Sequence, residues 1–199
     1  SETGAIDYRI KALNGELSLN DLFFEVNESS EIVDEVQVST VTFTANAGSG
    51  SIVRKYRLPS SGYQLSHKIE GEGLNNLIND EVLTINWQSE LKRLEEDMGE
   101  SRRKTYMNFY TADETYDYLS TGEGDDSEQV GEPIKWVAFK QRFFTSGIIA
   151  KEQFNNGNLA QETPIDSSYV KNMSATLQLP ITGEVNYYFG PNNYKVLKN

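Results

Sequence analysis

The sequence predicts a mainly all-β protein, folded as a sandwich or barrel of antiparallel strands. Apolar and polar residues alternate along most of the chain, which is typical of strands with one buried face. The alternating runs are short and are separated by turn sequences rich in Gly, Pro, Asn and Ser. Helical periodicity is weak and is confined to one stretch in the middle of the chain and one at its end.

The first predicted element is a β-hairpin over residues 7–19. Its turn is Asn14-Gly15, and both residue types tolerate the positive φ angles of a tight hairpin turn. Apolar residues alternate on both sides of this pair, at Tyr8, Ile10 and Ala12 before it and at Leu17 and Leu19 after it. The next alternating run, residues 35–47, shifts its phase after Val38, and a bulge or a short turn would absorb the shift.

Three further strands are predicted before the middle of the chain. Residues 51–59 and 63–71 alternate on either side of a tight loop that begins at Pro59. Residues 81–88 place Leu83, Ile85 and Trp87 on one face.

Residues 89–101 carry the best helical pattern. Ser89 is a candidate N-cap, and an apolar stripe is formed by Leu91, Leu94 and Met98. The segment is short and highly charged, so a loop with one or two helical turns is an equal alternative.

The second half of the chain contains more predicted strands. Residues 104–110 and 115–120 are short and aromatic, whereas residues 134–150 are the most apolar stretch of the sequence. Residues 171–181 hold five apolar positions in step. The acidic, Gly-rich stretch 121–132 is interpreted as a solvated loop within the domain.

The chain ends with a strand and the beginning of a helix. Val185, Tyr187 and Phe189 alternate, and Gly190-Pro191 ends this strand. Residues 192–199 then resemble the start of a helix, with Asn192 or Asn193 as its N-cap.

Composition limits the classes of function. The 199 residues are 37% hydrophobic and include 11 Tyr, 9 Phe and 2 Trp, which is enough to form one sizeable core. The formal net charge is −12, from 18 basic and 30 acidic residues, which argues against nucleic acid and anionic membrane surfaces as partners. The chain has no cysteine, so disulfides, thiolate nucleophiles and Cys-ligated zinc are excluded.

His67 is the single histidine and lies in phase with the apolar residues of its predicted strand. It could act as a general base or a ligand, but a hydrogen-bonded histidine at the edge of the core is the preferred interpretation. A Ser-His-Asp triad would have to use this residue, and no nucleophile-elbow motif accompanies it.

Acidic residues do not form a recognisable site. The stretch 121–132 could attract calcium, but it lacks the EF-hand spacing, so a solvated loop is preferred; its carboxylates are Glu123, Asp125, Asp126, Glu128 and Glu132. A carboxylate pair for glycoside hydrolysis cannot be recognised among 30 acidic residues. The sequence also lacks both common Gly-rich phosphate-binding motifs, so we expect no catalytic, cofactor-binding or metal-binding residues.

Residues 134–144 interleave aromatic and basic side chains. Trp136 and Phe139 alternate with Lys135 and Lys140, a pattern that single-strand nucleic-acid platforms and membrane-surface segments also show. Because the overall charge opposes binding to polyanions, we interpret the segment as a central strand with basic residues on its exposed face.

Four blocks of sequence resemble the periplasmic domain of YidC-type membrane protein insertases, in the form found in Bacteroides-like bacteria. They are "LTINWQSELKRLEE" (83–96), "IKWVAFKQRFF" (134–144), "YVKNMSATLQLP" (169–180) and "YYFGPNNYKVLK" (187–198). Their order and spacing also fit, whereas the first third of the chain fits more loosely. No single block is a catalytic signature, so the resemblance rests on the ensemble.

The resemblance implies a β-supersandwich similar to galactose mutarotase-like folds, with one or two short helices. It implies one domain over residues 1–199, in which residues 192–199 begin a connector toward a membrane helix beyond them. On this reading the chain ends at a cut, and some early strands of the family domain precede residue 1.

The implied function is that of a non-catalytic docking or client-handling module on the periplasmic side of the bacterial inner membrane. The implied partners are the Sec translocon with its accessory membrane proteins and nascent membrane protein clients. Membrane contact would be made by segments outside these 199 residues. The alternative is a carbohydrate-binding or mutarotase-like domain, against which the single histidine argues.

Overall fold

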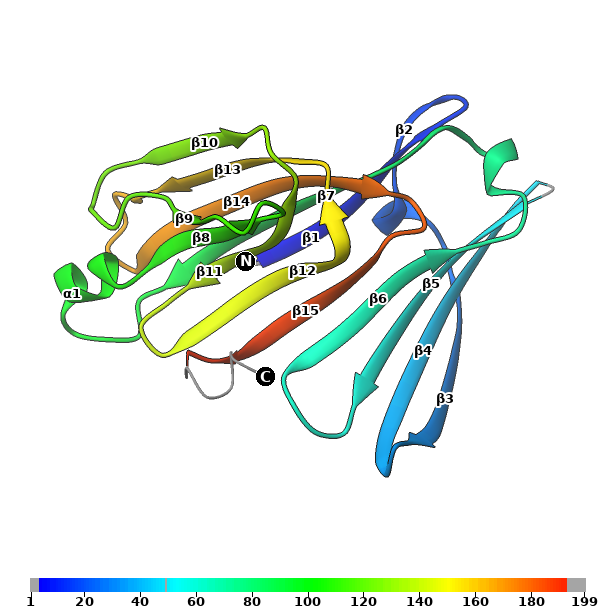
Figure 1. Cartoon of the computed structure of the whole chain (residues 1–199), viewed down its shortest axis with the longest axis horizontal. Coiled ribbons are helices and arrows are strands. Elements are labelled where there is room, and N and C mark those ends of the chain that lie inside the picture. The colour runs from blue at the N-terminus through cyan, green and yellow to red at the C-terminus, as the bar shows by residue number, and fades with distance from the viewer. Residues whose placement is uncertain (1–3, 49, 193–199) are drawn as a thin grey trace.

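The computed structural model describes residues 4–48 and 50–192, which form two antiparallel β-sheets (Figure 1). The six-stranded sheet contains, in spatial order, β10 (Asp126–Val130), β13 (Asn156–Glu162), β14 (Tyr169–Pro180), β7 (Ile78–Lys92), β1 (Gly4–Ala12) and β2 (Gly15–Ser18). The nine-stranded sheet contains β3 (Glu25–Val33), β4 (Val36–Ala47), β5 (Gly50–Pro59), β6 (Gln64–Glu70), β15 (Glu184–Pro191), β12 (Phe144–Phe154), β11 (Ile134–Lys140), β8 (Tyr106–Thr111) and β9 (Tyr116–Tyr118). The prediction of a mainly all-β sandwich is confirmed.

Three short helical segments complete the described part of the chain. They are the 3₁₀ turns η1 (Leu19–Asp21) and η2 (Leu74–Asn76) and the α-helix α1 (Met98–Arg103). No helix among the described residues is long and apolar enough to cross a membrane.

The main core lies between the two sheets. Residues two apart on a strand point to the same face, so β7 and β14 each present a row of apolar side chains to the nine-stranded sheet. At its centre the Trp87 ring of β7 stacks on Phe139 of β11, with ring centroids 3.5 Å apart and planes 7° apart. Leu83, Ile85, Leu177 and Ile148 are at most 2% exposed around this contact.

One end of the nine-stranded sheet extends beyond the other sheet. Figure 1 shows strands β3 to β6 as an arm that projects away from the layered part of the molecule. The arm is a continuous meander, because β3, β4, β5 and β6 pair in sequence order. Strands β1 and β2 of the six-stranded sheet reach only its base, where the side chains of Arg54 and Tyr8 meet.

The expected bulge or short turn after Val38 is wrong. Strand β4 pairs without a register shift, with β3 from Val36 to Thr44 and with β5 from Val38 to Ala47. The phase shift in the sequence therefore moves apolar side chains from one face of the strand to the other, with Val38 on one face and Val41 and Phe43 on the opposite one.

The expected helix N-cap at Ser89 is also wrong. Ser89 belongs to β7 and pairs with Gly4 on one side and with Met173 on the other, so hydrogen bonding from two neighbours continues the strand to Lys92. The helix starts nine residues later, at Met98, where the Asp97 side chain accepts a hydrogen bond from the Glu100 N–H.

The acidic stretch 121–132 is a loop only in part, which corrects the prediction. Its second half forms the edge strand β10, which pairs with β13 from Asp126 to Val130. The predicted connector at 192–199 lies outside the described residues except for Asn192.

Candidate functional site

The strongest candidate site is a groove on the inner face of the arm, which we call the β4–β6 groove. It has a volume of about 630 Å³. Its apolar lining comes from Phe24, Val41, Phe43, Tyr56, Leu58 and Leu65. The strand registers explain this set, since Val41 lies opposite Tyr56 and Phe43 lies opposite Arg54 on the same face of the sheet.

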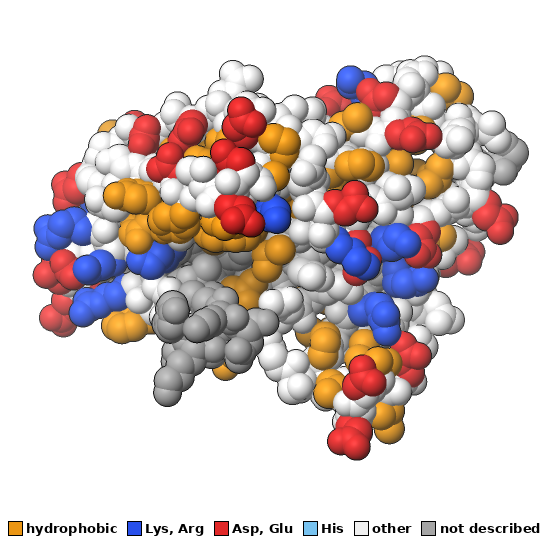
Figure 2. Space-filling view, in the orientation of Figure 1, with side chains coloured by type: hydrophobic (Ala, Val, Ile, Leu, Met, Phe, Trp, Pro, Cys, Tyr) orange, Lys and Arg blue, Asp and Glu red, His pale blue; other side chains and the backbone are white. Residues whose placement is uncertain are grey.

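The outer face of the same strands is charged. Figure 2 shows Lys and Arg side chains interspersed with acidic ones over this part of the molecule. Lys55 and Lys68 both pair with Glu70, at 3.0 and 3.1 Å, and Arg57 pairs with Glu31 at 2.8 Å. The arm therefore has a solvated face and an apolar face, and the apolar one extends beyond the six-stranded sheet.

Arg54 lies at the end of the groove that meets Tyr8 of β1 and Asn20 of η1. Only 9% of it is exposed. Its Nη1 donates to Asn20 Oδ1 at 3.0 Å, its Nη2 donates to the Tyr56 hydroxyl at 2.6 Å, and its guanidinium lies 4.5 Å from the centre of the Tyr8 ring. Among the described residues its Nε has no hydrogen-bond partner and no carboxylate forms an ion pair with it.

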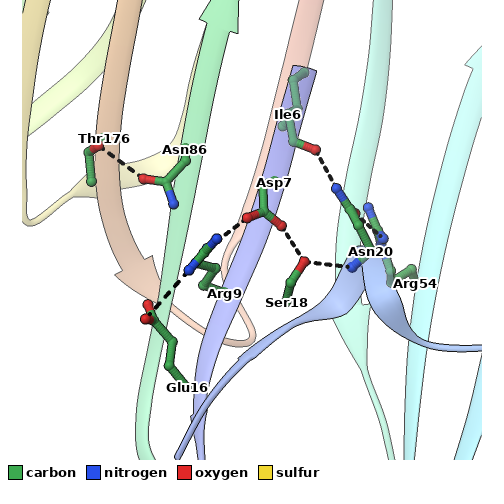
Figure 3. Close-up of polar contacts among 9 residues, drawn as sticks. All are labelled: Ile6, Asp7, Arg9, Glu16, Ser18, Asn20, Arg54, Asn86 and Thr176. Atoms are coloured by element: carbon green, nitrogen blue, oxygen red, sulfur yellow. Dashed lines mark hydrogen bonds and ion pairs between the residues drawn. The ribbon is translucent and has the colours of Figure 1, made fainter.

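A network of polar contacts from β1 and η1 fixes the position of Asn20 beside Arg54 (Figure 3). Asn20 Nδ2 donates to the Ile6 carbonyl at 2.8 Å, and its backbone N–H donates to Ser18 Oγ at 3.2 Å. Ser18 in turn donates to Asp7, which also accepts a hydrogen bond from Arg9 Nε at 2.7 Å. The Asp7 carboxylate is thus engaged by other donors, although it is near Arg54.

The donors and positive charges of this network keep the Asp7 carboxylate ionised. Burial raises the pKa of Asp7, but hydrogen bonds from Ser18 and Arg9 and the positive charges of Arg9 and Arg54 leave it below its ordinary value. Asp7 therefore stays ionised and contributes to the field around Arg54 without contacting it.

His67 lies beside Arg54 and is 98% buried, in the phase that the alternation predicts. Its ring stacks on Tyr56, with centroids 4.3 Å apart, and contacts Tyr8 at 4.7 Å. Burial, and then the charge of Arg54, lower its pKa to about 3, so the ring is neutral at physiological pH. Its Nε2 has no hydrogen-bond partner among the described residues, which differs from the hydrogen-bonded histidine that we expected.

Two carboxylates of the acidic stretch accept hydrogen bonds from backbone N–H groups. Asp125 accepts a hydrogen bond from the Thr163 N–H and Asp126 accepts one from the Ser120 N–H, at 2.8 and 2.7 Å. Within the ranges that the structure describes, no three His, Cys, Asp or Glu residues are arranged to hold a metal ion.

Residues 134–140 of the aromatic and basic block form β11, a central strand between β8 and β12, as the pattern predicts, whereas residues 141–143 form the turn to β12. Lys140 donates to the Tyr106 hydroxyl at 2.8 Å, and Arg142 pairs with Glu95 at 2.6 Å. On the same outer face the Trp136 ring stacks on Tyr110, with centroids 5.9 Å apart.

Sequence reasoning missed the groove and Arg54. The one signal was an arginine in phase with Ile52 and Tyr56, on the side of its strand that also carries apolar residues. That signal is weak, because arginines in strands are common on exposed faces and only the paired strands reveal which face is covered.

A family model described as the YidC periplasmic domain matches residues 8–199 of this chain. The chain belongs to this family. The resemblance recognised from the four sequence blocks is therefore confirmed.

Curated relatives named membrane protein insertase YidC agree with this assignment. The relative from Amoebophilus asiaticus is 34% identical over 194 residues, which is 92% of this chain and 33% of the relative. The relatives from Cytophaga hutchinsonii and Phocaeicola vulgatus are 30% and 27% identical and cover 79% and 98% of this chain. The chain spans about a third of the length of these YidC proteins.

Among solved structures, a GH36 alpha-galactosidase from Geobacillus stearothermophilus has a similar fold. It aligns with a TM-score of 0.50 and 9% identity, over 95% of this chain and 30% of the galactosidase chain. At this level of identity the likeness concerns the fold alone.

Proposed function

We propose that this YidC periplasmic domain is a non-catalytic docking module on the periplasmic side of the bacterial inner membrane. In this role it binds extended segments of nascent membrane protein clients, or of the Sec translocon and its accessory proteins. The observation that carries the proposal is the edge strand β3, which ends the nine-stranded sheet and pairs with β4 alone among the described residues. A free edge can accept a further strand by β-augmentation.

Strand β3 lacks most of the features that protect sheet edges. All nine of its residues are exposed, and it contains no Pro, no Lys and no register shift. Val26 and Ile32, which are 56% and 78% exposed, share the inner face of the strand. The acidic residues Glu25, Glu28 and Glu31 favour a partner strand that combines apolar and basic residues.

The non-catalytic assignment is part of the proposal. His67, the residue that a Ser-His-Asp triad or histidine-dependent mutarotation would have to use, is enclosed between two tyrosines and is neutral. The named relatives are insertases, which supports a role in membrane protein insertion. We also propose that residues 1–199 act as one domain, with the connector to a membrane segment following residue 192.

A carbohydrate-binding role is the second candidate, and the outer face of β8, β9 and β11 favours it. Figure 2 shows hydrophobic side chains gathered over this region. Tyr110 stacks on Trp136, and Tyr116 and Tyr118 are 50% and 49% exposed beside them. Stabilisation of the protein by galactose, lost in Trp136→Ala, would favour this candidate over docking.

The geometry of β3 provides a sharp test of docking. A two-residue turn at Asp34 and Glu35, both with positive φ, makes Val33 and Val36 a hydrogen-bonded pair. The N–H groups of alternate residues therefore point toward β4, and that of Ser30 points outward to the free edge. Ser30→Pro removes an edge donor and retains the pairing of β3 with β4, whereas Ser30→Ala retains the donor.

The measurement is photo-crosslinking in the full-length insertase in membranes, from a photoreactive residue at Asn27. We expect crosslinks to client or translocon proteins that fall several-fold in Ser30→Pro and persist in Ser30→Ala. If Asn27 forms no crosslink to any such protein, or if both variants crosslink like the parent, docking through β3 is wrong.

A further inference from the structure

The floor of the β4–β6 groove offers side chains but no free backbone groups. Strand β4 is hydrogen-bonded to β3 and β5, β5 to β4 and β6, and β6 to β5 and β15. An occupant of the groove therefore cannot bind by strand addition, in contrast to a partner at the β3 edge. It has to bind through contacts with the side chains of the lining.

Those side chains suit a hydrocarbon chain better than a peptide. Six of the nine lining residues are apolar or aromatic: Phe24, Val41, Phe43, Tyr56, Leu58 and Leu65. Apart from Arg54, the polar groups are those of Asn20 and Ser39 and the Tyr56 hydroxyl, which already accepts a hydrogen bond from Arg54. Asn20 Oδ1 and Nδ2 are already used by Arg54 and Ile6. A peptide lying here would lose water from its N–H and C=O groups without gaining partners, which is costly, whereas an acyl chain has no such groups.

Arg54 supplies the one charge of the lining. A guanidinium that is nine-tenths buried is costly unless an anion compensates it, and the two acceptors that Arg54 has, Asn20 and Tyr56, are neutral. The ionised Asp7 carboxylate offsets part of this charge from nearby, but its hydrogen bonds go to Arg9 and Ser18, so it leaves Arg54 without a direct anionic partner. The Arg54 end of the groove thus favours an added anion, and a carboxylate matches the fork of donors on a guanidinium.

The distance along the groove fits a single chain. Arg54 and Leu58 lie on the same face of β5, four residues apart, which corresponds to roughly 13 Å at about 3.3 Å per residue. Arg54 is buried beside Asn20 and Phe24 at one end, and Leu58, which is 53% exposed, lies toward the other end. A ligand with one anionic head would place that head at Arg54 and its tail over Tyr56 and Leu58.

We propose that the β4–β6 groove binds a single-chain fatty acid anion, with its carboxylate on Arg54 and its hydrocarbon tail along β4 and β5. This site is distinct from the β3 edge and does not depend on the docking role. An extended apolar peptide is the competing occupant, and its binding is measured in the same experiment.

The test is calorimetric titration of the chain with dodecanoate, below its micelle concentration, and with dodecanol, which has the same tail and no charge. We expect dodecanoate to bind at least tenfold more tightly than dodecanol. Arg54→Gln should remove this difference by weakening dodecanoate alone. Leu58→Glu, at the exposed end, should weaken both ligands, and Ile165→Glu, at an exposed apolar residue that does not line the groove, should weaken neither.

Three results would overturn the proposal. They are equal affinities for dodecanoate and dodecanol in the parent protein, no effect of Leu58→Glu, or tighter binding of an uncharged apolar peptide than of dodecanoate with loss of both in Leu58→Glu. None of the three requires a change at Arg54, so the proposal stays testable if Arg54→Gln does not fold.

Discussion

At the scale of single residues, His67 links stability to acid. Its pKa is about 3 in the folded protein and 6.5 in the unfolded chain, so between these values the unfolded chain binds the extra proton. The stability contributed by the neutral ring is complete above pH 6.5 and is lost as the pH falls toward 3. The loss attributable to His67 is ~3 kcal/mol between pH 7 and pH 4.

We therefore expect His67→Phe, which retains an aromatic ring between Tyr56 and Tyr8, to lose less stability on acidification than the parent. Urea unfolding at pH 7 and pH 4 measures the difference, and other titrating groups cancel in the comparison. Gln64→His is the control, because Gln64 is exposed and a histidine there titrates alike in both states. Equal acid losses in His67→Phe and the parent would contradict the assignment.

Lys171 is a second buried titratable group, and its energetic cost can be measured. It is fully buried, and its Nζ donates to the Ser120 carbonyl at 3.3 Å, an oxygen that Gln161 also uses. Burial lowers its pKa to about 8, although Asp126 and Asp125 act in the opposite direction. At pH 7 the fold therefore holds a buried positive charge that has no ion-pair partner among the described residues.

Replacing Lys171 with Met should raise the free energy of unfolding at pH 7 by about 1–3 kcal/mol. Because the unfolded pKa of 10.5 exceeds the folded one, the parent gains stability as the pH rises from 8 to 10.5, and the gap between the two proteins narrows. Urea unfolding across this range checks both statements. Lys151→Met, at an exposed lysine paired with Glu184, should change the stability by less than about 0.5 kcal/mol, and a less stable Lys171→Met would reverse the conclusion.

At the scale of elements, the sequence predicts most strands but not where they end or which strands they pair with. The hairpin at Asn14-Gly15 and the central strand at 134–140 follow from local alternation and turn residues, and the structure contains both. The strand end at Ser89 does not follow from them, because it is set by pairing with Gly4 and Met173, far away in the sequence. Strands β3, β10 and β13 were also missed, and β3 and β10 lie at sheet edges, where polar residues weaken the apolar signal.

The groove could not be predicted from the sequence. Whether the apolar face of one sheet is covered depends on how far the other sheet extends over it. Val41 and Phe43 alternate like core residues, and alternation cannot tell whether the other sheet reaches them. Arg54 is explained only when Tyr8 and Asn20, from β1 and η1, are seen beside it. Local sequence patterns therefore predict the apolar row of the groove. The position of the Arg54 charge at the end of that row depends on the tertiary arrangement.

At the scale of the whole molecule, the two sheets have different exposure to partners. The layered part buries the Trp87–Phe139 core on both sides, whereas the arm offers a free edge at β3 and an apolar groove on β4 to β6. The proposed docking at the edge and the proposed amphiphile binding in the groove would use different groups, backbone donors in one case and side chains in the other. The two proposals are therefore compatible, because they do not compete for the same atoms.

The charge of the molecule leads to a last prediction, about salt. With 18 basic and 30 acidic residues the net charge is −12, so like charges repel more strongly in the compact state than in the unfolded chain. Raising NaCl from ~20 to ~300 mM shortens the screening length several-fold and should increase stability by about 1 kcal/mol. The urea midpoint, at constant denaturant slope, measures this gain.

Exchanging the exposed residues Glu123 and Glu132 for Lys changes the net charge from −12 to −8, since each exchange adds two charges, and should reduce the gain in stability. A stability that falls with salt would instead mean that ion pairs such as Arg142–Glu95 outweigh the general repulsion.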